Sequence, residues 1–286
     1  MVQYKKKPNL KYLPKVSIIT PSFNQVNFIE NTIKSVLKQD YQNIEYIIID
    51  GGSNDGTIDI IKKYEKDVAY WISESDNGQS AAINKGLKVA TGDIIGWINS
   101  DDVYYENAIS SAIQILNEHP EIDIVFGNFD YIDVKGKIIH QSKEIKLNLL
   151  VYLFTQQCYH CNVAGLFRKK CFDAYGFIRE DLTYSMDYEL YIRFASNKCK
   201  FYQSNKILGA YRLHSQSKTS TAVNRFVAEA KMVSQSYKEK FEFNPIYDKS
   251  LKYLFTVYRL ILKVFRGAYT PNHVMKGIRH RKQYGV

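Results

Sequence analysis

The strongest constraint on the fold is a strand, loop and helix pattern that repeats along the first third of the chain. Four short β-rich runs each end in a polar turn, at residues 16–20, 46–49, 68–73 and 94–98. Between them apolar residues recur at helical spacing, as at Ile29, Ile33 and Val36. Alternating strands and helices form parallel sheets. The sequence therefore predicts an α/β protein with a doubly wound, mostly parallel sheet.

Acidic residues stand where three of these strands end. Asp50 closes the second run, Asp76 follows the third, and Asp101 and Asp102 follow the fourth. Right-handed crossovers bring the carboxyl ends of the strands to one edge, where ligands of open α/β sheets bind. Residues 51–56 could form only a turn, but an acid directly at a strand end can also accept hydrogen bonds from a base or ribose. We therefore expect an acidic cluster at this edge.

Two functions fit the segment 99–102, which reads Asn-Ser-Asp-Asp. Adjacent carboxylates repel each other unless a cation compensates, and Mg²⁺ or Mn²⁺ would bind one or two of them together with diphosphate oxygens. Alternatively, Ser100 or Asp102 could cap a helix that begins near Val103. The position beside Asp50 and Asp76 favours the metal site.

Six short motifs, in this order and spacing, resemble the family 2 glycosyltransferases. They cover residues 16–24, 49–57, 73–79, 82–86, 90–93 and 97–102, and the similarity extends over about residues 14–215. The resemblance implies the A-type glycosyltransferase fold, a nucleotide-diphosphate sugar as donor, with a UDP-sugar favoured, and inversion at the anomeric carbon.

The resemblance also implies roles for single residues. Pro21 and Asp50 would lie along the nucleoside, with Asp76 near it. Asp102 would be the main metal ligand, with Asp101 beside it at the nucleotide sugar. This chain has Gly51 where many members have a second aspartate.

An inverting displacement needs a base on the sugar face opposite the diphosphate. The acids of the donor half are committed to metal and nucleotide, so the base must come later. Asp187 opens an expected helix and resembles the family's catalytic acid at the start of the acceptor-side helix. It could instead only stabilise the helix dipole. Glu189 is the second candidate for the base.

The polar segment 211–220 lacks periodicity and resembles a loop that closes over the donor. The resemblance implies that His214 is a metal or diphosphate ligand and that Arg212 or Lys218 contacts phosphate. A lone surface histidine is the alternative.

The four cysteines do not predict a disulfide scaffold or a zinc site. Cys158 and Cys161 form a C-x-x-C pattern around His160, but Cys171 and Cys199 are not spaced as a second ligand pair. We therefore expect buried, reduced thiols.

The net charge of +10 is concentrated at the two ends of the chain. Residues 1–29 carry five lysines and no acid, and residues 248–286 carry nine basic residues against Asp248. The residues between have a net charge of −3. An acidic body suits a metal site and no nucleic-acid partner.

The C-terminal stretch 249–266 predicts an amphipathic helix. Most positions of this stretch are apolar. The others form one basic stripe that is interrupted by one threonine: Lys249, Lys252, Thr256, Arg259, Lys263 and Arg266. The run is shorter than the roughly 20 residues that span a bilayer, so we expect it to lie on an anionic membrane surface, helped by the basic residues 279–282. In the alternative, the apolar face packs on the domain and the bases face water.

The sequence predicts two regions. Residues 1–225 would form the catalytic domain, with a donor half at about 14–102 and an acceptor half at about 103–225. Residues 226–286 would form a helical, basic region. The lysine-rich start lacks an apolar stretch, so we expect no signal peptide or N-terminal anchor, and a cytoplasmic protein peripheral to the inner face of the plasma membrane.

The expected function is metal-dependent, inverting transfer of a sugar to an acceptor hydroxyl. The acceptor would be a glycan or lipid-linked glycan in bacterial surface polysaccharide or glycolipid assembly. A nicotinamide enzyme does not fit, because residues 21–25 contain no glycine. The alternative is a non-catalytic, membrane-docked protein that binds nucleotide sugars.

Overall fold

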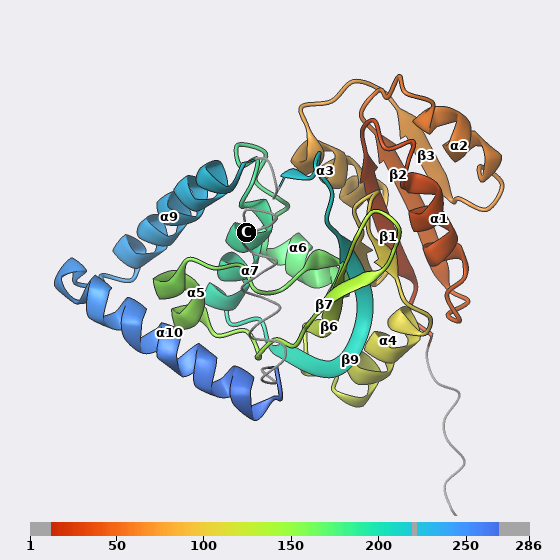
Figure 1. Ribbon diagram of the computed structural model, residues 1–286. Coiled ribbons are helices and arrows are strands. Elements are labelled where there is room, and N and C mark those ends of the chain that lie inside the picture. The colour runs from red at the N-terminus through yellow and green to blue at the C-terminus, as the bar shows by residue number, and fades with distance from the viewer. Residues whose placement is uncertain (1–12, 219–221, 269–286) are drawn as a thin grey trace, which may run out of the picture.

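The computed structural model describes residues 13–218 and 222–268 (Figure 1). A nine-stranded sheet has the order β3-β2-β1-β4-β8-β6-β9-β5, with β7 paired to β6. The strands are β1 (Val16–Ser22), β2 (Ile44–Asp50), β3 (Tyr70–Ser73), β4 (Ile94–Trp97), β5 (Val103–Tyr104), β6 (Ile124–Ile132), β7 (Ile138–Ser142), β8 (Gly165–Arg168) and β9 (Phe201–Arg212).

Helices follow most of the strands. They are α1 (Ile29–Leu37), α2 (Thr57–Lys63), α3 (Gln79–Val89), α4 (Ala108–Glu118), α5 (Leu149–Thr155), α6 (Lys169–Tyr175), α7 (Met186–Ser196), α9 (Val223–Lys240) and α10 (Asp248–Phe265), with short 3-10 turns η1 (Asn162–Ala164) and η2 (Pro245–Tyr247).

The first four strands are parallel, as predicted. β1 pairs with β2 and β4, and β2 pairs with β3, all in parallel register. The run Ile47, Ile48 and Ile49 is buried, which is typical of a parallel strand covered on both faces. Beyond β4 the sheet becomes mixed, because β8 runs antiparallel to both β4 and β6.

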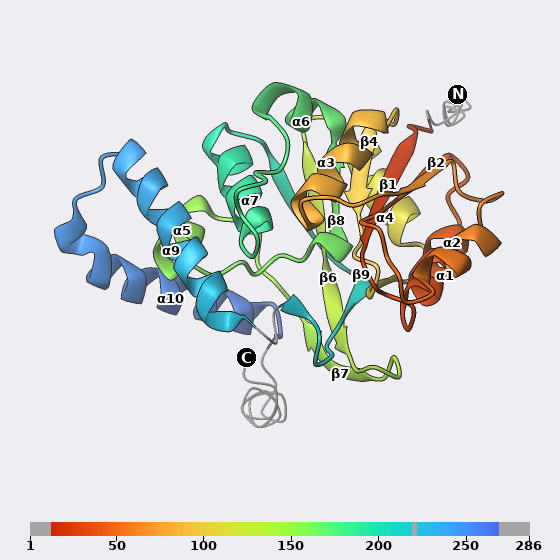
Figure 2. The same ribbon diagram turned by 90° about the horizontal axis from the view of Figure 1, so that it is seen from above.

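Helices cover both faces of the sheet (Figures 1 and 2). On one face, α1, α2 and α4 enclose a core together with the residues of β1 and β2 that point to that face. On the other face α3, α5, α6 and α7 enclose a second core around Trp97, which stacks on Phe167 at 5.2 Å between ring centroids. The predicted α/β class is confirmed.

The helical C-terminal region is also present, and it packs against the acceptor half (Figure 2). α9 contacts α5 and α7, and α10 contacts α5. Ala230 and Val233 of α9 belong to the same core as α5 and α7. The division at residue 225 stays a prediction. None of the helices in the described ranges combines the length and hydropathy needed to cross a membrane.

The orientation of α10 is the reverse of the alternative in which the apolar face packs on the domain and the bases face water. Arg259 and Lys263 of α10 point to the body and pair with the buried Glu144, while most of the apolar side chains face outward. The basic residues 279–282 lie outside the described residues.

Candidate active site

The carboxyl ends of β1, β2, β3 and β4 bring the expected acids to one edge of the sheet. Asp50 is the last residue of β2 and lies in register between Ser22 of β1 and Ser73 of β3. Pro21 pairs one step earlier with Ile49 and is buried. These residues therefore form the end of the sheet at this edge.

The Asp50 carboxylate is fully buried and shapes its own turn. Its oxygens accept hydrogen bonds from the backbone N–H groups of Gly52 (3.1 Å) and Ser53 (2.9 Å), and from the hydroxyls of Ser53 (2.6 Å) and Ser73 (2.7 Å). Gly52 has a φ of +84°, which favours glycine. The turn residues therefore donate hydrogen bonds to the Asp50 carboxylate, and this carboxylate in turn holds the loop at the edge of the sheet.

Asp76 lies directly in front of Gly51. A β-carbon built on Gly51 would stand 3.1 Å from Asp76 Oδ2, and Asp76 Oδ1 accepts a hydrogen bond from the Gly78 amide at 2.8 Å. A side chain at position 51 would thus be in tight contact with the half-buried Asp76 carboxylate, which would have to shift slightly. A second aspartate at position 51 would repel it.

Asp101 and Asp102 occupy different environments. Asp102 is fully buried, and its two oxygens accept hydrogen bonds from the Arg212 amide (2.9 Å) and from Asn99 Nδ2 (3.1 Å). Burial, followed by the neighbouring charge of Asp101, raises the pKa of Asp102 well above its usual range. The Asp101 side chain is 18% exposed, and its Oδ2 lies 2.9 Å from His214 Nε2. Asp101 is therefore the acid that faces the edge.

Neither alternative for these residues agrees with the structure. Residues 103–104 form strand β5, and the next helix begins at Ala108 after Asn107, so neither Ser100 nor Asp102 caps a helix. His214 is not a lone surface histidine, because it is buried, bonds Asp101 and packs 4.7 Å from the Phe28 ring.

Arg212 is a structural link within this site. Its Nε donates to the Asp101 carbonyl at 2.7 Å and its Nη1 to the Asp133 carbonyl at 3.0 Å, while the guanidinium lies 5.2 Å from the Phe28 ring. Through these bonds β9 holds the loop that carries Asp101. Lys218, farther along the same segment, bonds Gln79 Oε1 at 3.0 Å.

The chemistry of the donor set fits a divalent cation. Two ligands at right angles on an ion with bonds of about 2.1 Å are about 3.0 Å apart, and Asp101 Oδ2 and His214 Nε2 are 2.9 Å apart. Within the described part of the chain, no three His, Cys, Asp or Glu residues converge as a complete metal site. A cation held here would thus take most of its ligands from the substrate or from water.

Asp187 stands at the start of α7 with a raised pKa. Burial raises the pKa of its carboxyl to about 6, against the hydrogen bond from the Tyr188 amide (2.7 Å) and the influence of the nearby Cys158 thiol. A pKa near neutrality suits a general base. Glu189 does not suit that role, because its buried carboxylate pairs with Arg193 at 3.0 Å and accepts from the Tyr237 hydroxyl at 2.9 Å.

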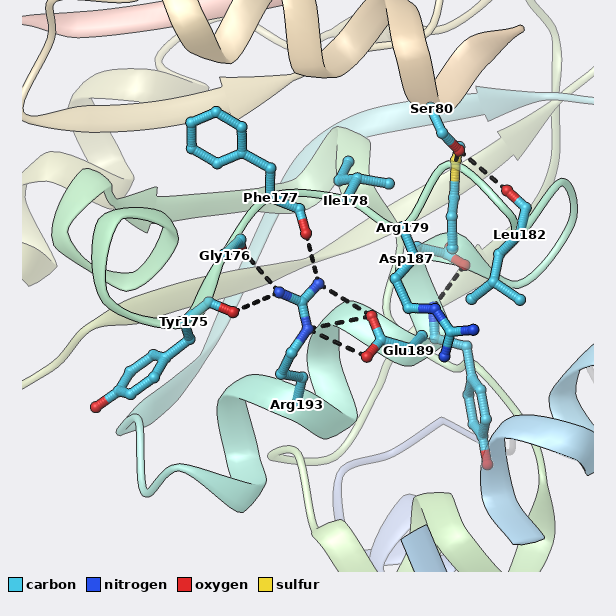
Figure 3. A network of polar contacts seen from close by, with 12 residues as sticks. Ser80, Tyr175, Gly176, Phe177, Ile178, Arg179, Leu182, Asp187, Glu189 and Arg193 are labelled. Carbon is cyan, nitrogen blue, oxygen red and sulfur yellow. Dashed lines mark hydrogen bonds and ion pairs between the residues drawn. The ribbon is translucent and has the colours of Figure 1, made fainter. Parts of the chain in front are cut away.

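A network of polar contacts fixes the start of α7 (Figure 3). Arg193 donates to the carbonyls of Tyr175, Gly176 and Phe177 while it pairs with Glu189. Ser80 of α3 donates to the Leu182 carbonyl at 3.0 Å. The segment before Asp187 is therefore tied to both α3 and the α6–α7 connection.

Two residues of this site were not expected from the sequence. Glu229 of α9 accepts the amides of Thr183 (3.2 Å), Tyr184 (2.8 Å) and Ser185 (2.8 Å), just before α7. Cys158 lies beside Asp187 and acts against the rise in the pKa of that carboxyl, although its C-x-x-C pattern suggested only a buried thiol.

Cys161 and His160, the other members of the C-x-x-C pattern, have structural roles. Cys161 is buried, and both cysteines are free thiols. His160 is buried and bonds the Tyr152 hydroxyl at 2.8 Å and Gln203 at 3.0 Å. Burial lowers the pKa of His160 to about 4, so it is neutral.

Comparisons with known proteins agree with this geometry. Residues 17–176 match the model of glycosyl transferase family 2. This chain is a member of glycosyl transferase family 2. An uncharacterised glycosyltransferase of Rickettsia typhi is 33% identical over 223 residues, which are 75% of this chain and 69% of that protein. One from Haemophilus influenzae is 34% identical over 139 residues, which are 46% of this chain and 55% of that protein.

Solved structures of glycosyltransferases share the fold. A structure of Staphylococcus aureus TarS with UDP-GlcNAc aligns with a TM-score of 0.62 at 21% identity, over 83% of this chain and 76% of that one. The mannosyltransferase PcManGT of Pyrobaculum calidifontis, with GDP-Man and Mn²⁺, aligns with a TM-score of 0.59 at 16% identity, over 93% and 85%. The predicted A-type glycosyltransferase fold is confirmed. Against another TarS structure the chain spans 43% of the length.

Proposed function

We propose that this family 2 glycosyltransferase is a divalent-metal-dependent, inverting enzyme that uses a UDP-sugar. The observation that carries the proposal is the Asp101–His214 pair at 2.9 Å, placed at the edge of the sheet where β4 and β9 end. Carboxylate oxygen and imidazole nitrogen are both ligands for Mn²⁺, and Mg²⁺ favours the oxygen. A bound ion would neutralise the negative charge of the diphosphate leaving group.

The two adjacent acids then have separate roles. Asp101 is the direct ligand together with His214, since its carboxylate is the exposed one. Asp102 was expected to be the main ligand, but both its oxygens accept protein hydrogen bonds. Its role is to hold the loop that carries Asp101, through its hydrogen bonds with Asn99 and Arg212. Arg212 supports the same loop through its bond to the Asp101 carbonyl.

Asp187 is the base that takes the proton of the acceptor hydroxyl as that oxygen attacks the sugar. Attack from the face opposite the diphosphate inverts the anomeric centre. The Tyr188 amide holds the carboxylate in place. Glu229 holds the backbone segment before it.

The nucleoside lies over Pro21, Asp50 and Asp76. Support for a uracil base is indirect: TarS, a structure of similar fold, was solved with UDP and with UDP-GlcNAc. The acid that accepts a hydrogen bond from the base is Asp76, whose carboxylate lies in front of Gly51. The acceptor is a glycan or lipid-linked glycan of a bacterial surface polysaccharide or glycolipid, met at the inner face of the plasma membrane.

Calorimetric titration with UDP, GDP and TDP, each with and without Mn²⁺, tests the donor half. We expect Mn²⁺-dependent binding of UDP, weakened at least tenfold in Asp101→Asn and in His214→Ala. The matched controls Asp173→Asn and His119→Ala change an exposed aspartate and an exposed histidine outside the site, and should bind UDP normally. Equal binding with and without Mn²⁺, or normal binding by both site variants, would refute the metal assignment.

A further inference from the structure

α10 carries more exposed large hydrophobic side chains than any other element of the described chain. Nine of the 22 exposed large hydrophobic side chains among the described residues fall within residues 246–265. Phe265 is 83% exposed, Tyr253 75% and Val264 58%. We define the outward face by its exposed members on the helix: Tyr253, Leu254, Tyr258, Leu260, Ile261, Val264 and Phe265.

The opposite face of the helix is locked to the body. The buried Glu144 accepts bonds from Arg259 Nη2 at 3.1 Å and Lys263 Nζ at 2.8 Å. The Arg259 guanidinium also lies 4.3 Å from the Tyr159 ring, and Phe255 stacks on Phe154 at 5.5 Å. Removing one member of a buried charge cluster leaves the others unpaired, which is costly. The helix therefore cannot roll to hide its apolar face without breaking these pairs.

The charge around the outward face selects the partner. No acidic residue lies among residues 249–268, and Lys249 and Lys252 are exposed. A second copy would bring the same positive charge to the contact and would be repelled. An anionic lipid surface would attract it, by about 1 kcal/mol for each basic residue near the surface.

The dimensions favour a helix that lies in the plane of the surface. α10 has 18 residues, and only one side of it is apolar and exposed. Spanning a bilayer takes about 20 consecutive, predominantly apolar residues. The tyrosines on the outward face suit the boundary, because each has an apolar ring and a polar hydroxyl. We propose that the outward face of α10 docks this protein on an anionic bilayer, with the helix parallel to the membrane.

Co-sedimentation of the full chain with vesicles tests this proposal. We expect binding to vesicles of phosphatidylcholine with phosphatidylglycerol, and little binding to phosphatidylcholine alone. The double variant Ile261→Asp/Val264→Asp should bind at least tenfold more weakly. The matched control Val134→Asp/Ile138→Asp changes two similarly exposed apolar side chains at the β6–β7 turn and should bind like the wild type.

Two further measurements make the result decisive. Both double variants should keep the thermal midpoint of the wild type and its nucleotide affinity, since the changed side chains are exposed and outside the donor site. The proposal is overturned if the wild-type protein does not bind anionic vesicles, or if the variant Ile261→Asp/Val264→Asp binds them normally. It is also overturned if sedimentation equilibrium shows that the wild type is a dimer and the α10 variant a monomer, and the wild type does not bind vesicles. The occupant of the outward face is then a second copy.

Discussion

At the scale of single residues, the site depends on pairs of acids whose surroundings differ. Asp101 and Asp102 are adjacent in sequence, yet one is partly exposed beside His214 and the other is fully buried. Asp187 and Glu189 also lie close in sequence, and only Asp187 lacks an ion-pair partner among the described contacts. Differences in burial and partners thus separate the expected roles of neighbouring carboxylates.

The raised pKa of Asp187 predicts the pH dependence of turnover. The base must be deprotonated, so kcat should fall about tenfold per pH unit below about 6 and level off above it. Asp187→Asn should bind UDP normally and lose at least 10²-fold in kcat, as expected for loss of a general base. Steady-state assays from pH 5 to 8 measure both. A variant that transfers sugar at the wild-type rate would disprove the assignment.

The same shift has a consequence for stability. The folded-state pKa of Asp187 is above its ordinary value of 3.8, so the folded protein binds this proton more tightly than the unfolded chain. The free energy of unfolding contributed by Asp187 therefore decreases as pH rises from about 4 to about 6. Asp187→Asn should have a higher thermal midpoint than the wild type at pH 8, and the difference should shrink below pH 5.

At the scale of elements, α9 completes the acceptor side of the site. Its Glu229 accepts three consecutive amides that precede α7, in the manner of a capping side chain supplied by another helix. Ser234 of α9 also donates to the Leu153 carbonyl of α5 at 2.6 Å. A helix expected to belong to a tail therefore positions the segment that carries Asp187.

Replacing Glu229 tests this link. Glu229→Ala should lower the free energy of unfolding by about 1 to 2 kcal/mol, as the loss of a capping group does, and should lower kcat more than it weakens UDP binding. Glu229→Gln retains one acceptor oxygen and should recover part of both. Glu239→Ala, an exposed change on the same helix, is the control. Equal loss of UDP affinity and kcat in Glu229→Ala would indicate a general structural defect instead of a positioning role.

At the scale of the whole molecule, the acceptor half and the C-terminal helices share one hydrophobic core. Ala230 and Val233 of α9 are buried in it with residues of α5 and α7, and Leu251, Phe255 and Leu262 of α10 pack against its edge. The sheet edge with Asp101 and the start of α7 with Asp187 belong to different layers of this assembly. Their relative placement depends on the packing of α3 against the segment before α7.

Truncation of the chain tests whether residues 1–225 are sufficient for folding. Ending it after Arg225 removes most of α9 and all of α10 and exposes the apolar side of α5 and α7, so we expect loss of cooperative thermal unfolding and poor solubility. Burial of each large apolar side chain contributes about 1.5 to 3 kcal/mol, comparable to a sizeable share of total stability. Calorimetry of the truncated and full chains measures the effect. A truncated chain with a sharp transition near that of the full chain would support a boundary at 225.

The sequence by itself determined the donor half of the fold, because hydrophobic period and turn residues are local signals. The strand that ends at Asp50, the strand that precedes Asp101 and Asp102, and the helices between them follow from residues close together in the chain. Strand order, and hence the gathering of these acids at one edge, follows from the handedness of crossovers.

Only the tertiary structure decided which acids are exposed and which contacts cross between distant segments. Asp101 meets His214, Glu229 meets the amides before α7, and Glu144 turns the basic side of α10 inward, each over a separation of more than 40 residues. Burial and pairing at such separations depend on how helices pack, which no local pattern encodes. The sequence indicated which residues carry charge, and the packing determined which of those charges face water, protein or a partner.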